Sequence, residues 1–348
     1  MKAFEIGTLP SGKRNLKIVP YEVHHLEMDE KGKIRSVAVP EISPYRVKSF
    51  LNWFEIPCGY CDGCRIDRSR EWANRCMLEL QYHDSAYFVT LTYNQDHVPI
   101  SYYADPETGE AQQSMTLSKR DWQLFMKRLR KAFPDDKIRF YACGEYGSTT
   151  FRPHYHAIIF GLHLDDLVPV KDVQRGELGY QYFTSASLQR CWSMVQLNGE
   201  ISPIGYVMVG RVTWETCAYV ARYVMKKQYG QDAQVYEEFN IEPEFTLMSR
   251  RPGIARQWFE DHPECYNYDF INLSSDRGGL KIRPPKYFDR LFDVDHHDEL
   301  TELKAKRQHF AEESKKGMMD KTNLEYLDLL KIKENNFRNR IKNLKRDL

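Results

Sequence analysis

The sequence predicts an α+β fold in which an antiparallel sheet carries helices on one face. Segments that read as strands and as helices follow one another in the order strand–helix–strand–strand–helix, with a further edge strand. This order departs from the regular strand–helix alternation that builds a doubly wound parallel sheet. The two consecutive strands, at 137–143 and 154–161, are joined by a turn that holds Gly147 and Pro153, as expected of an antiparallel hairpin.

The individual elements are expected in the following places. Residues 1–56 mix short strand-like runs with charged turns and lead into a cysteine cluster. Apolar residues at helical or alternating spacing predict helices at 65–83, 117–131, 185–195 and 214–228, and strands at 87–92, 137–143, 154–161 and 206–212. Ser118 and Thr213 stand where two of these helices need an N-cap. A helical extension is expected at the C-terminal end.

Composition restricts the class of protein. Hydrophobic residues make up 42% of the 348 positions and aromatic residues 13%, which excludes a wholly disordered chain and leaves room for a sizeable core. No apolar run is long enough to cross a bilayer, and the first residues lack the apolar core of a secretory signal. We therefore expect a protein with no membrane partner that works in the cytoplasm of the cell containing it.

Two histidines, His154 and His156, alternate within an otherwise apolar strand. Alternate residues of a strand face the same side, so both imidazoles project together. A pair of imidazoles on one face is suited to holding a divalent metal. Two hydrogen-bonded histidines on a half-exposed strand would give the same pattern, and the pair alone does not decide between the two.

The helix expected at 214–228 carries Tyr219 and Tyr223 one turn apart, with Lys226 and Lys227 close to Tyr223. Ordinary amphipathic packing also produces such spacing. Beside a metal, however, a tyrosine can attack a phosphodiester and form a covalent phosphotyrosine, and a lysine can help its hydroxyl to ionise. We predict Tyr219, Tyr223 and Lys226 as catalytic residues.

These features together resemble a known superfamily. The histidine pair followed by Tyr219-Val-Ala-Arg-Tyr223-Val-Met-Lys226 is similar to the two-tyrosine branch of the HUH endonucleases, which initiate rolling-circle replication. The runs Phe88-Val-Thr-Leu-Thr-Tyr93, Gly144-Glu-Tyr-Gly147 and the cysteine-rich segment 57–65 fit the same group. The overall likeness is to the replication initiation proteins of the Microviridae, in particular the gokushoviruses, and it covers about half of the chain.

The resemblance implies an HUH version of an RRM-like palm, with the histidine strand central and the tyrosine helix facing a metal. A hairpin would bring Glu145 close to His154, and the resemblance likewise implies Glu145 as the third metal ligand, with Mg²⁺ or Mn²⁺ as the cofactor. His97 and His163 are weaker alternatives for that place.

The implied activity is site-specific nicking and joining of single-stranded origin DNA through a 5′-phosphotyrosine, in the cytoplasm of a bacterial host cell. The chain has no P-loop, so a host helicase and a host DNA polymerase are the implied partners. We predict four parts of the chain: an N-terminal extension at 1–57, an endonuclease core at 58–230 with the cysteine cluster at 58–76, an accessory region at 231–295 and a charged helical tail at 296–348.

Four of the eight cysteines, Cys58, Cys61, Cys64 and Cys76, lie close together in the sequence. Because disulfides are rare in the cytoplasm, we hypothesise a structural Zn²⁺ bound by these four thiolates, with His83 as a competing fourth ligand. An iron–sulfur cluster is the rival metal group, and free thiols are a further alternative.

The net charge of +1 hides an uneven distribution of basic residues. The helix expected at 117–131 buries Trp122, Phe125, Met126 and Leu129 and carries one acid, Asp121. Its basic residues are the predicted DNA contacts: Lys119, Arg120, Lys127, Arg128, Arg130 and Lys131. A solvated helix face explains this pattern equally well. The segment 331–346 is a second basic run with the same two interpretations.

Two other functions stay open at this point. A non-catalytic DNA-binding protein would use the histidines and cysteines only to bind structural metals. A relaxase or transposase of the same superfamily would share the chemistry and differ in its substrate. Which of Tyr219 and Tyr223 attacks first is not decided by the sequence.

Overall fold

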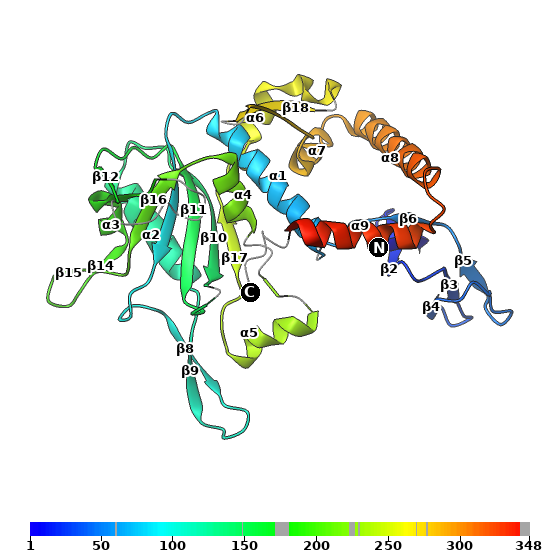
Figure 1. Cartoon of the computed structure of the whole chain (residues 1–348), viewed down its shortest axis with the longest axis horizontal. Coiled ribbons are helices and arrows are strands. Elements are labelled where there is room, and N and C mark those ends of the chain that lie inside the picture. The colour runs from blue at the N-terminus through cyan, green and yellow to red at the C-terminus, as the bar shows by residue number, and fades with distance from the viewer. Residues whose placement is uncertain are drawn as a thin grey trace. The chain divides into compact units, whose positions relative to one another are not determined.

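Two compact units make up the chain, and Figure 1 labels their elements. The computed structural model describes residues 1–59, 61–147, 149–170, 181–222, 227–228, 230–268, 270–275 and 278–341. One unit contains Met1–Cys64 together with Lys315–Arg340, and the other consists chiefly of Arg65–Ser314. Within the described residues, no helix is both long enough and apolar enough to cross a membrane.

The first unit is built on two small antiparallel sheets and a helix. Strands β1 (Lys2–Thr8), β2 (Arg14–Val19) and β6 (Trp53–Glu55) form one sheet, and β3 (His25–Met28), β4 (Ile34–Val37) and β5 (Lys48–Phe50) form the other. Phe4, Val19, Val23, Leu26 and Phe50 make its apolar core. The end of the chain adds α9 (Tyr326–Ile341), and Lys315 Nζ binds Glu55 Oε1 at 2.9 Å. The short strands expected in this segment are therefore confirmed.

The second unit is organised around a seven-stranded sheet in which every pairing is antiparallel. Its strands, in spatial order, are β12 (Leu167–Pro169), β13 (Phe183–Ser185), β16 (Val207–Arg211), β7 (Ala86–Thr92), β11 (Pro153–Phe160), β10 (Arg139–Tyr146) and β17 (Phe245–Met248). The histidine strand β11 is paired along its whole length, with β7 on one side and β10 on the other. The α+β class and the antiparallel sheet are confirmed.

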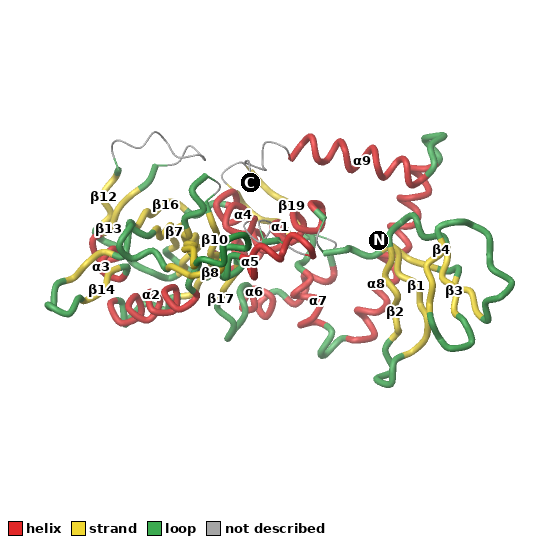
Figure 2. The backbone as a smooth tube through the Cα atoms, turned by 90° about the horizontal axis from the view of Figure 1, so that it is seen from below, coloured by secondary structure: helices red, strands yellow, loops and turns green. Residues whose placement is uncertain are grey.

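Helices cover both faces of this sheet rather than one (Figure 2). On one face, α2 (Lys119–Ala132) and α3 (Ala186–Cys191) pack against Tyr155 and Ile159. On the other, α1 (Asp62–Leu80) and α4 (Trp214–Arg222) pack against Ile158 and Phe160. The reason is visible in β11, whose C-terminal half is apolar at every position, so that both faces must be covered to exclude water.

The remaining elements extend the second unit. Two hairpins, β8 (Ile100–Ala104) with β9 (Ala111–Met115) and β14 (Ser193–Val195) with β15 (Ile201–Pro203), project from it. The short helix α5 (Gln234–Glu238) precedes β17. A further group comprises α6 (Arg256–Asp261), β18 (Ile271–Ser275), β19 (Gly278–Ile282), α7 (Lys286–Phe292) and α8 (His297–Met319). Trp258 and Phe288 stack in the core of this group at a ring-centroid distance of 5.8 Å. The helical C-terminal extension is confirmed by α8 and α9.

Both expected N-caps are present. Ser118 accepts a hydrogen bond from the backbone N–H of Asp121 at the start of α2. Thr213 Oγ1 accepts from the N–H of Thr216, and Thr216 Oγ1 accepts in return from the N–H of Thr213 at 2.8 Å. Each bond satisfies a backbone donor that the helix itself leaves unpaired. The reciprocal pair fixes the residue at which α4 begins, and with it the direction in which Tyr219 points.

Candidate active site

The sheet register brings three metal-ligand side chains to one face. In the β10–β11 pairing, Glu145 lies opposite His154 and Cys143 lies opposite His156. Residues directly opposite in an antiparallel pair point to the same side, and so do residues two apart on one strand. Glu145, His154 and His156 therefore share a face. The sequence placed Glu145 just beyond the end of its strand, whereas β10 continues through Tyr146 and holds Glu145 rigidly.

The three side chains converge on one point. The ligand atoms of Glu145, His154 and His156 all lie within 4.8 Å of one another. Glu145 Oε1 is 2.6 Å from Nε2 of His154 and 3.0 Å from Nε2 of His156. The two imidazole rings are perpendicular, with centroids 4.9 Å apart. This arrangement presents one carboxylate oxygen and two imidazole nitrogens to a single cation.

The Nδ1 atoms of His154 and His156, which point away from Glu145, each have a hydrogen-bond partner. His154 Nδ1 is 3.1 Å from the carbonyl oxygen of Arg152, and His156 Nδ1 is 2.9 Å from Thr90 Oγ1. A carbonyl oxygen only accepts, so Nδ1 of His154 carries the proton, and a neutral ring directs an Nε2 lone pair at the Glu145 carboxylate. Two acceptors facing each other need a proton or a cation between them. The donor set thus fits a divalent metal, with the outer-shell bonds usual for metal-bound histidines.

Burial and charge act on Glu145 in opposite directions. Its side chain is only 2% exposed, and burial alone would raise the pKa of its carboxyl. When no cation is bound and the two imidazoles are protonated, their hydrogen bonds and positive charge together outweigh burial, so that the pKa of Glu145 lies far below its usual range. The carboxylate is therefore ionised at neutral pH and ready to bind a metal.

Tyr219 lies beside this group of ligands. Helix α4 packs on β10 and β11, and the Tyr219 ring meets the His156 ring edge-on with centroids 5.3 Å apart. The Phe88 ring stacks on the His156 ring with centroids 5.7 Å apart. It also meets the Tyr219 ring edge-on, with centroids 5.9 Å apart. The helix is tied to α1 by Ser69 Oγ, which donates to the carbonyl of Ala218 at 3.1 Å. The predicted catalytic residues Tyr223 and Lys226 lie outside the described residues.

Comparison with known proteins gives the family. Residues 86–228 match the family model of the replication-associated protein ORF2. The chain is 32% identical over 337 residues to the replication-associated protein ORF2 of Spiroplasma virus 4, covering 94% of this chain and 97% of that one. The chain belongs to this family of replication-associated proteins. No solved structure gives a significant match.

Two further relatives come from phages of the same kind. The replication-associated protein VP4 of Bdellovibrio phage phiMH2K is 28% identical over 292 residues, covering 80% of this chain and 82% of that one. The replication-associated protein ORF4 of Chlamydia phage 1 is 31% identical over 192 residues, covering 53% of this chain and 40% of that one. The resemblance to Microviridae replication proteins is thereby confirmed. The part matched by the family model runs from β7 past α4 and so contains every residue of the site described above.

The other histidines proposed as metal ligands of this replication-associated protein are engaged elsewhere. His97 Nδ1 is 2.8 Å from Asn94 Oδ1. His163 lies between Asp136 and Asp84, at 2.8 Å and 3.2 Å. Both belong to loops rather than to the face of the sheet that carries His154. Among the described residues, Glu145 is the side chain that groups with His154 and His156 as a candidate third ligand.

The basic helix α2 packs on the opposite face of the sheet from the histidines. Tyr155, which alternates with them, donates its hydroxyl to the carbonyl of Ser118 at 2.7 Å. Lys119 pairs with Glu242 at 2.5 Å, and Arg128 Nε donates to the carbonyl of Cys191 at 2.6 Å. Arg130 bonds a backbone carbonyl at 3.5 Å, whereas Arg120, Lys127 and Lys131 are exposed. The DNA-contacting role of this helix stays a prediction, and its surface does not line the metal-ligand site.

Arg152 and Arg222 near the site, and Arg65 on α1, were not proposed as functional residues from the sequence. Arg152 stands two residues before His154, and its guanidinium binds Gln95 Oε1 at 2.6 Å. Arg222 lies over the Tyr219 ring, 5.9 Å from its centroid, and Arg65 donates to the carbonyl of Lys227 at 3.3 Å. Guanidinium groups bind phosphate in a forked geometry. Arg152 and Arg222 could have been identified from the sequence, because Arg152 lies close to His154 and Arg222 lies between the two tyrosines.

Tyr155, which lies between the two histidines on β11, places its hydroxyl in a hydrogen-bond network on the opposite face of the sheet. Its hydroxyl accepts from the N–H of Ser118 and lies 2.7 Å from the hydroxyl of Tyr93, which donates to Asp121. We expect Tyr155→Phe to lower the free energy of unfolding by about 1–3 kcal/mol, because it leaves buried polar groups without a partner. Chemical denaturation followed by fluorescence measures this, with Tyr102→Phe on the exposed β8 strand as the control. Equal stability of the two variants would contradict the proposed role of the hydroxyl.

The cysteine cluster differs from the prediction in one member. Cys58, Cys61 and Cys64 have thiol sulfurs within 4.8 Å of one another. Cys76 lies twelve residues beyond Cys64 on α1, which corresponds to a rise of about 18 Å. It is fully buried and hydrogen-bonded to Cys217. His83 is engaged by Glu79 at 3.2 Å. Neither Cys76 nor His83 therefore completes the cluster.

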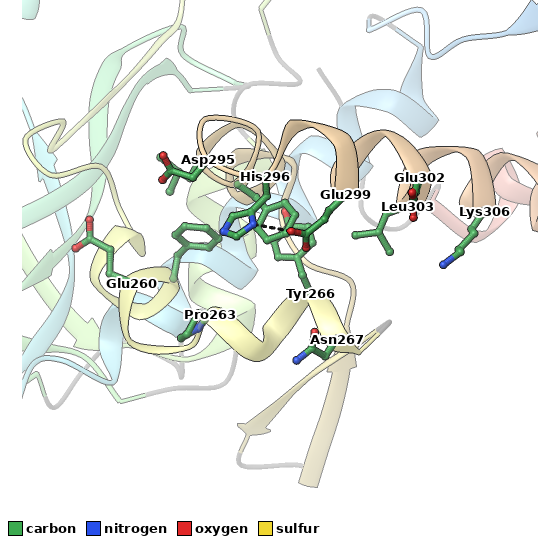
Figure 3. A pocket seen from close by; sticks show the side chains of 13 residues that line it. Glu260, Pro263, Tyr266, Asn267, Asp295, His296, Glu299, Glu302, Leu303 and Lys306 are labelled. Atoms are coloured by element: carbon green, nitrogen blue, oxygen red, sulfur yellow. Dashed lines mark hydrogen bonds and ion pairs between the residues drawn. The ribbon is translucent and has the colours of Figure 1, made fainter.

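A hollow of about 470 Å³ lies between α6, α7 and α8 (Figure 3). Phe259, Tyr266 and Phe292 contribute aromatic surface to it. The acidic side chains around it are Glu260, Asp295, Glu299 and Glu302. No residue of the histidine site lines this hollow, and its negative charge disfavours a nucleic-acid phosphate.

Proposed function

We propose that this replication-associated protein is a rolling-circle replication initiator that nicks and rejoins single-stranded DNA by HUH chemistry. The observation that supports the proposal is the Tyr219 ring packed edge-on against His156, one of three side chains whose potential ligand atoms lie within 4.8 Å of one another. A nucleophile side chain and a metal site on rigid elements are the two parts that such a reaction needs. Membership of a family of replication-associated proteins supports a role in DNA replication.

The chain's own residues fall into distinct roles. Glu145, His154 and His156 would hold Mg²⁺ or Mn²⁺, which suits their carboxylate and imidazole ligands. When bound, the ion polarises the scissile phosphate and neutralises charge that builds on its oxygens. Arg152 and Arg222 flank the site and supply guanidinium groups for neighbouring phosphates.

Tyr219 acts as the nucleophile in this mechanism. Its hydroxyl gives its proton to solvent and its oxygen bonds to phosphorus, while the bond from phosphorus to the 3′-oxygen breaks and that oxygen takes a proton from solvent. The 5′-phosphate stays on the tyrosine and the released 3′-hydroxyl primes a host polymerase. Because the covalent bond conserves the energy of the phosphodiester, attack by a 3′-hydroxyl rejoins DNA without ATP. Tyr223 provides the second nucleophile, and Lys226 helps the tyrosine hydroxyl to ionise. A host helicase separates the DNA strands.

The decisive experiment asks whether the wild-type chain forms a covalent adduct with DNA. Single-stranded DNA of the parent phage genome, carrying a label, is incubated with the protein and Mn²⁺ or Mg²⁺ and run on a denaturing gel. We expect a protein–DNA band that survives denaturation, with no band in EDTA. A folded protein that binds the DNA but gives no adduct with any origin fragment or metal would show instead a non-catalytic binding protein. The family assignment favours a replication protein over the relaxase or transposase alternative.

A further inference from the structure

The first unit contains a second group of metal-ligand side chains that the replication chemistry does not use. Cys58, Cys61 and Cys64 lie in the segment between β6 and the first turn of α1, which begins at Asp62. Cys61 is exposed and the other two are partly exposed. All three belong to the same unit, and their grouping is independent of the histidine site.

The spacing of the sulfurs identifies the kind of metal centre. The Sγ atoms of Cys58 and Cys64 are 3.8 Å apart, and all three lie within 4.8 Å of one another. Zinc–sulfur bonds of about 2.3 Å at tetrahedral angles put two thiolates about 3.8 Å apart. An iron–sulfur cluster distributes its cysteines over more than one iron with bridging sulfides, so that cysteines bound to different irons lie further apart. The observed distance therefore fits a single ion.

Backbone N–H groups around the cysteines point at their sulfurs. The N–H of Cys61 donates to Cys58 Sγ at 3.2 Å, and the N–H of Cys64 donates to the Cys61 sulfur. Gly59 permits this turn, since its φ of 85° is one that other residues rarely adopt. The N-terminal end of α1 adds the partial positive charge of its unpaired N–H groups. Burial and the neighbouring thiols nevertheless raise the pKa of Cys61 to about 11, so the case for a metal site depends on the positions of the three sulfurs.

We propose that Cys58, Cys61 and Cys64 bind one zinc ion through their thiolates, with the fourth coordination position open to water or another exogenous ligand. Among the described residues, no other cysteine, histidine, aspartate or glutamate joins the three sulfurs. A site of three protein ligands and one exchangeable ligand differs from the closed four-cysteine site that a purely structural zinc has. The ion ties the end of β6 to the beginning of α1 by linking positions 58 and 64.

The test uses the full-length protein purified without chelators. Elemental analysis is expected to give one zinc per chain. Cys58→Ser and Cys64→Ser should lose it, whereas Cys76→Ala and the control Cys191→Ser should keep it. The variant with both His154→Ala and His156→Ala should also keep it, which separates this site from the proposed catalytic one. Circular dichroism shows whether each variant is folded.

Cobalt substitution in the wild-type chain provides a readout that needs no variant. The thiolate-to-cobalt absorption should have the intensity of three thiolates, and added imidazole should shift it because one position is exchangeable. Loss of zinc in Cys76→Ala, or a spectrum of four thiolates that imidazole leaves unchanged, would overturn the three-ligand site. Iron with inorganic sulfide, or a wild-type protein that binds no zinc or cobalt, would overturn the proposal altogether.

Discussion

The protein with both Tyr219→Phe and Tyr223→Phe is expected to form no covalent adduct with single-stranded DNA. Removal of a catalytic nucleophile lowers the rate by about 10³-fold or more, because the rest of the site cannot supply the attacking atom. The loss should appear in the rate of the chemical step and leave DNA affinity unchanged. A single-turnover assay on a denaturing gel, with a separate DNA-binding measurement, distinguishes the two.

Phenylalanine is the appropriate replacement because the ring of Tyr219 is also part of the packing. It contacts His156 and Phe88, and Phe retains those contacts while it removes the hydroxyl. Tyr82→Phe is the matched control, since Tyr82 lies outside the site and its hydroxyl binds Asp261. An adduct that persists in the double variant would mean that another residue is the nucleophile.

The single variants assign the order of the two tyrosines. Because the Tyr219 ring packs against His156, a proposed metal ligand, we expect Tyr219→Phe alone to reduce the first cleavage strongly. Tyr223→Phe should leave the first cleavage and impair the joining step that needs a second nucleophile. If Tyr223→Phe abolishes the first cleavage and Tyr219→Phe does not, the order is the reverse of the one proposed.

Local patterns predicted much of the site, because its geometry follows from strand alternation and helix capping. His154 and His156 share a face simply because they are two apart on a strand. Thr213 begins α4 as expected, and Glu145 reaches His154 through a hairpin register that the short turn made predictable. Each of these features depends on residues that are close in sequence, where backbone geometry leaves few alternatives.

Features that depend on the packing of distant segments were not predictable in the same way. Amphipathic spacing showed that α2 has an apolar face. The residues close to it in sequence do not determine which side of the sheet that face covers. Cys76 was grouped with Cys58 from sequence proximity, whereas α1 carries it away and buries it against Cys217. In both cases the sequence supplied the chemistry of the side chain and tertiary packing decided its neighbours.

Glu145→Gln is expected to reduce metal-dependent cleavage by at least about 100-fold. The substitution keeps the shape of the side chain and removes the negative charge that two imidazoles and a divalent cation share. Glu145 Oε1 is within 3.0 Å of both histidines, so the amide would also present an N–H₂ group or a neutral oxygen where a charged acceptor now stands. Higher Mn²⁺ concentrations should recover part of the activity, because the two imidazoles still bind the ion.

Measurement of cleavage rate against Mn²⁺ concentration separates loss of metal affinity from loss of fold. Glu110→Gln on the exposed β8–β9 turn is the matched control and should behave as the wild type. Glu145→Asp keeps the charge but shortens the reach from β10, so we expect an intermediate metal requirement. The rigid position of Glu145 inside a paired strand makes this series informative, since the backbone cannot move to compensate. Full activity of Glu145→Gln at the wild-type metal concentration would contradict the assignment of Glu145 as a ligand and leave only the two histidines to hold the ion.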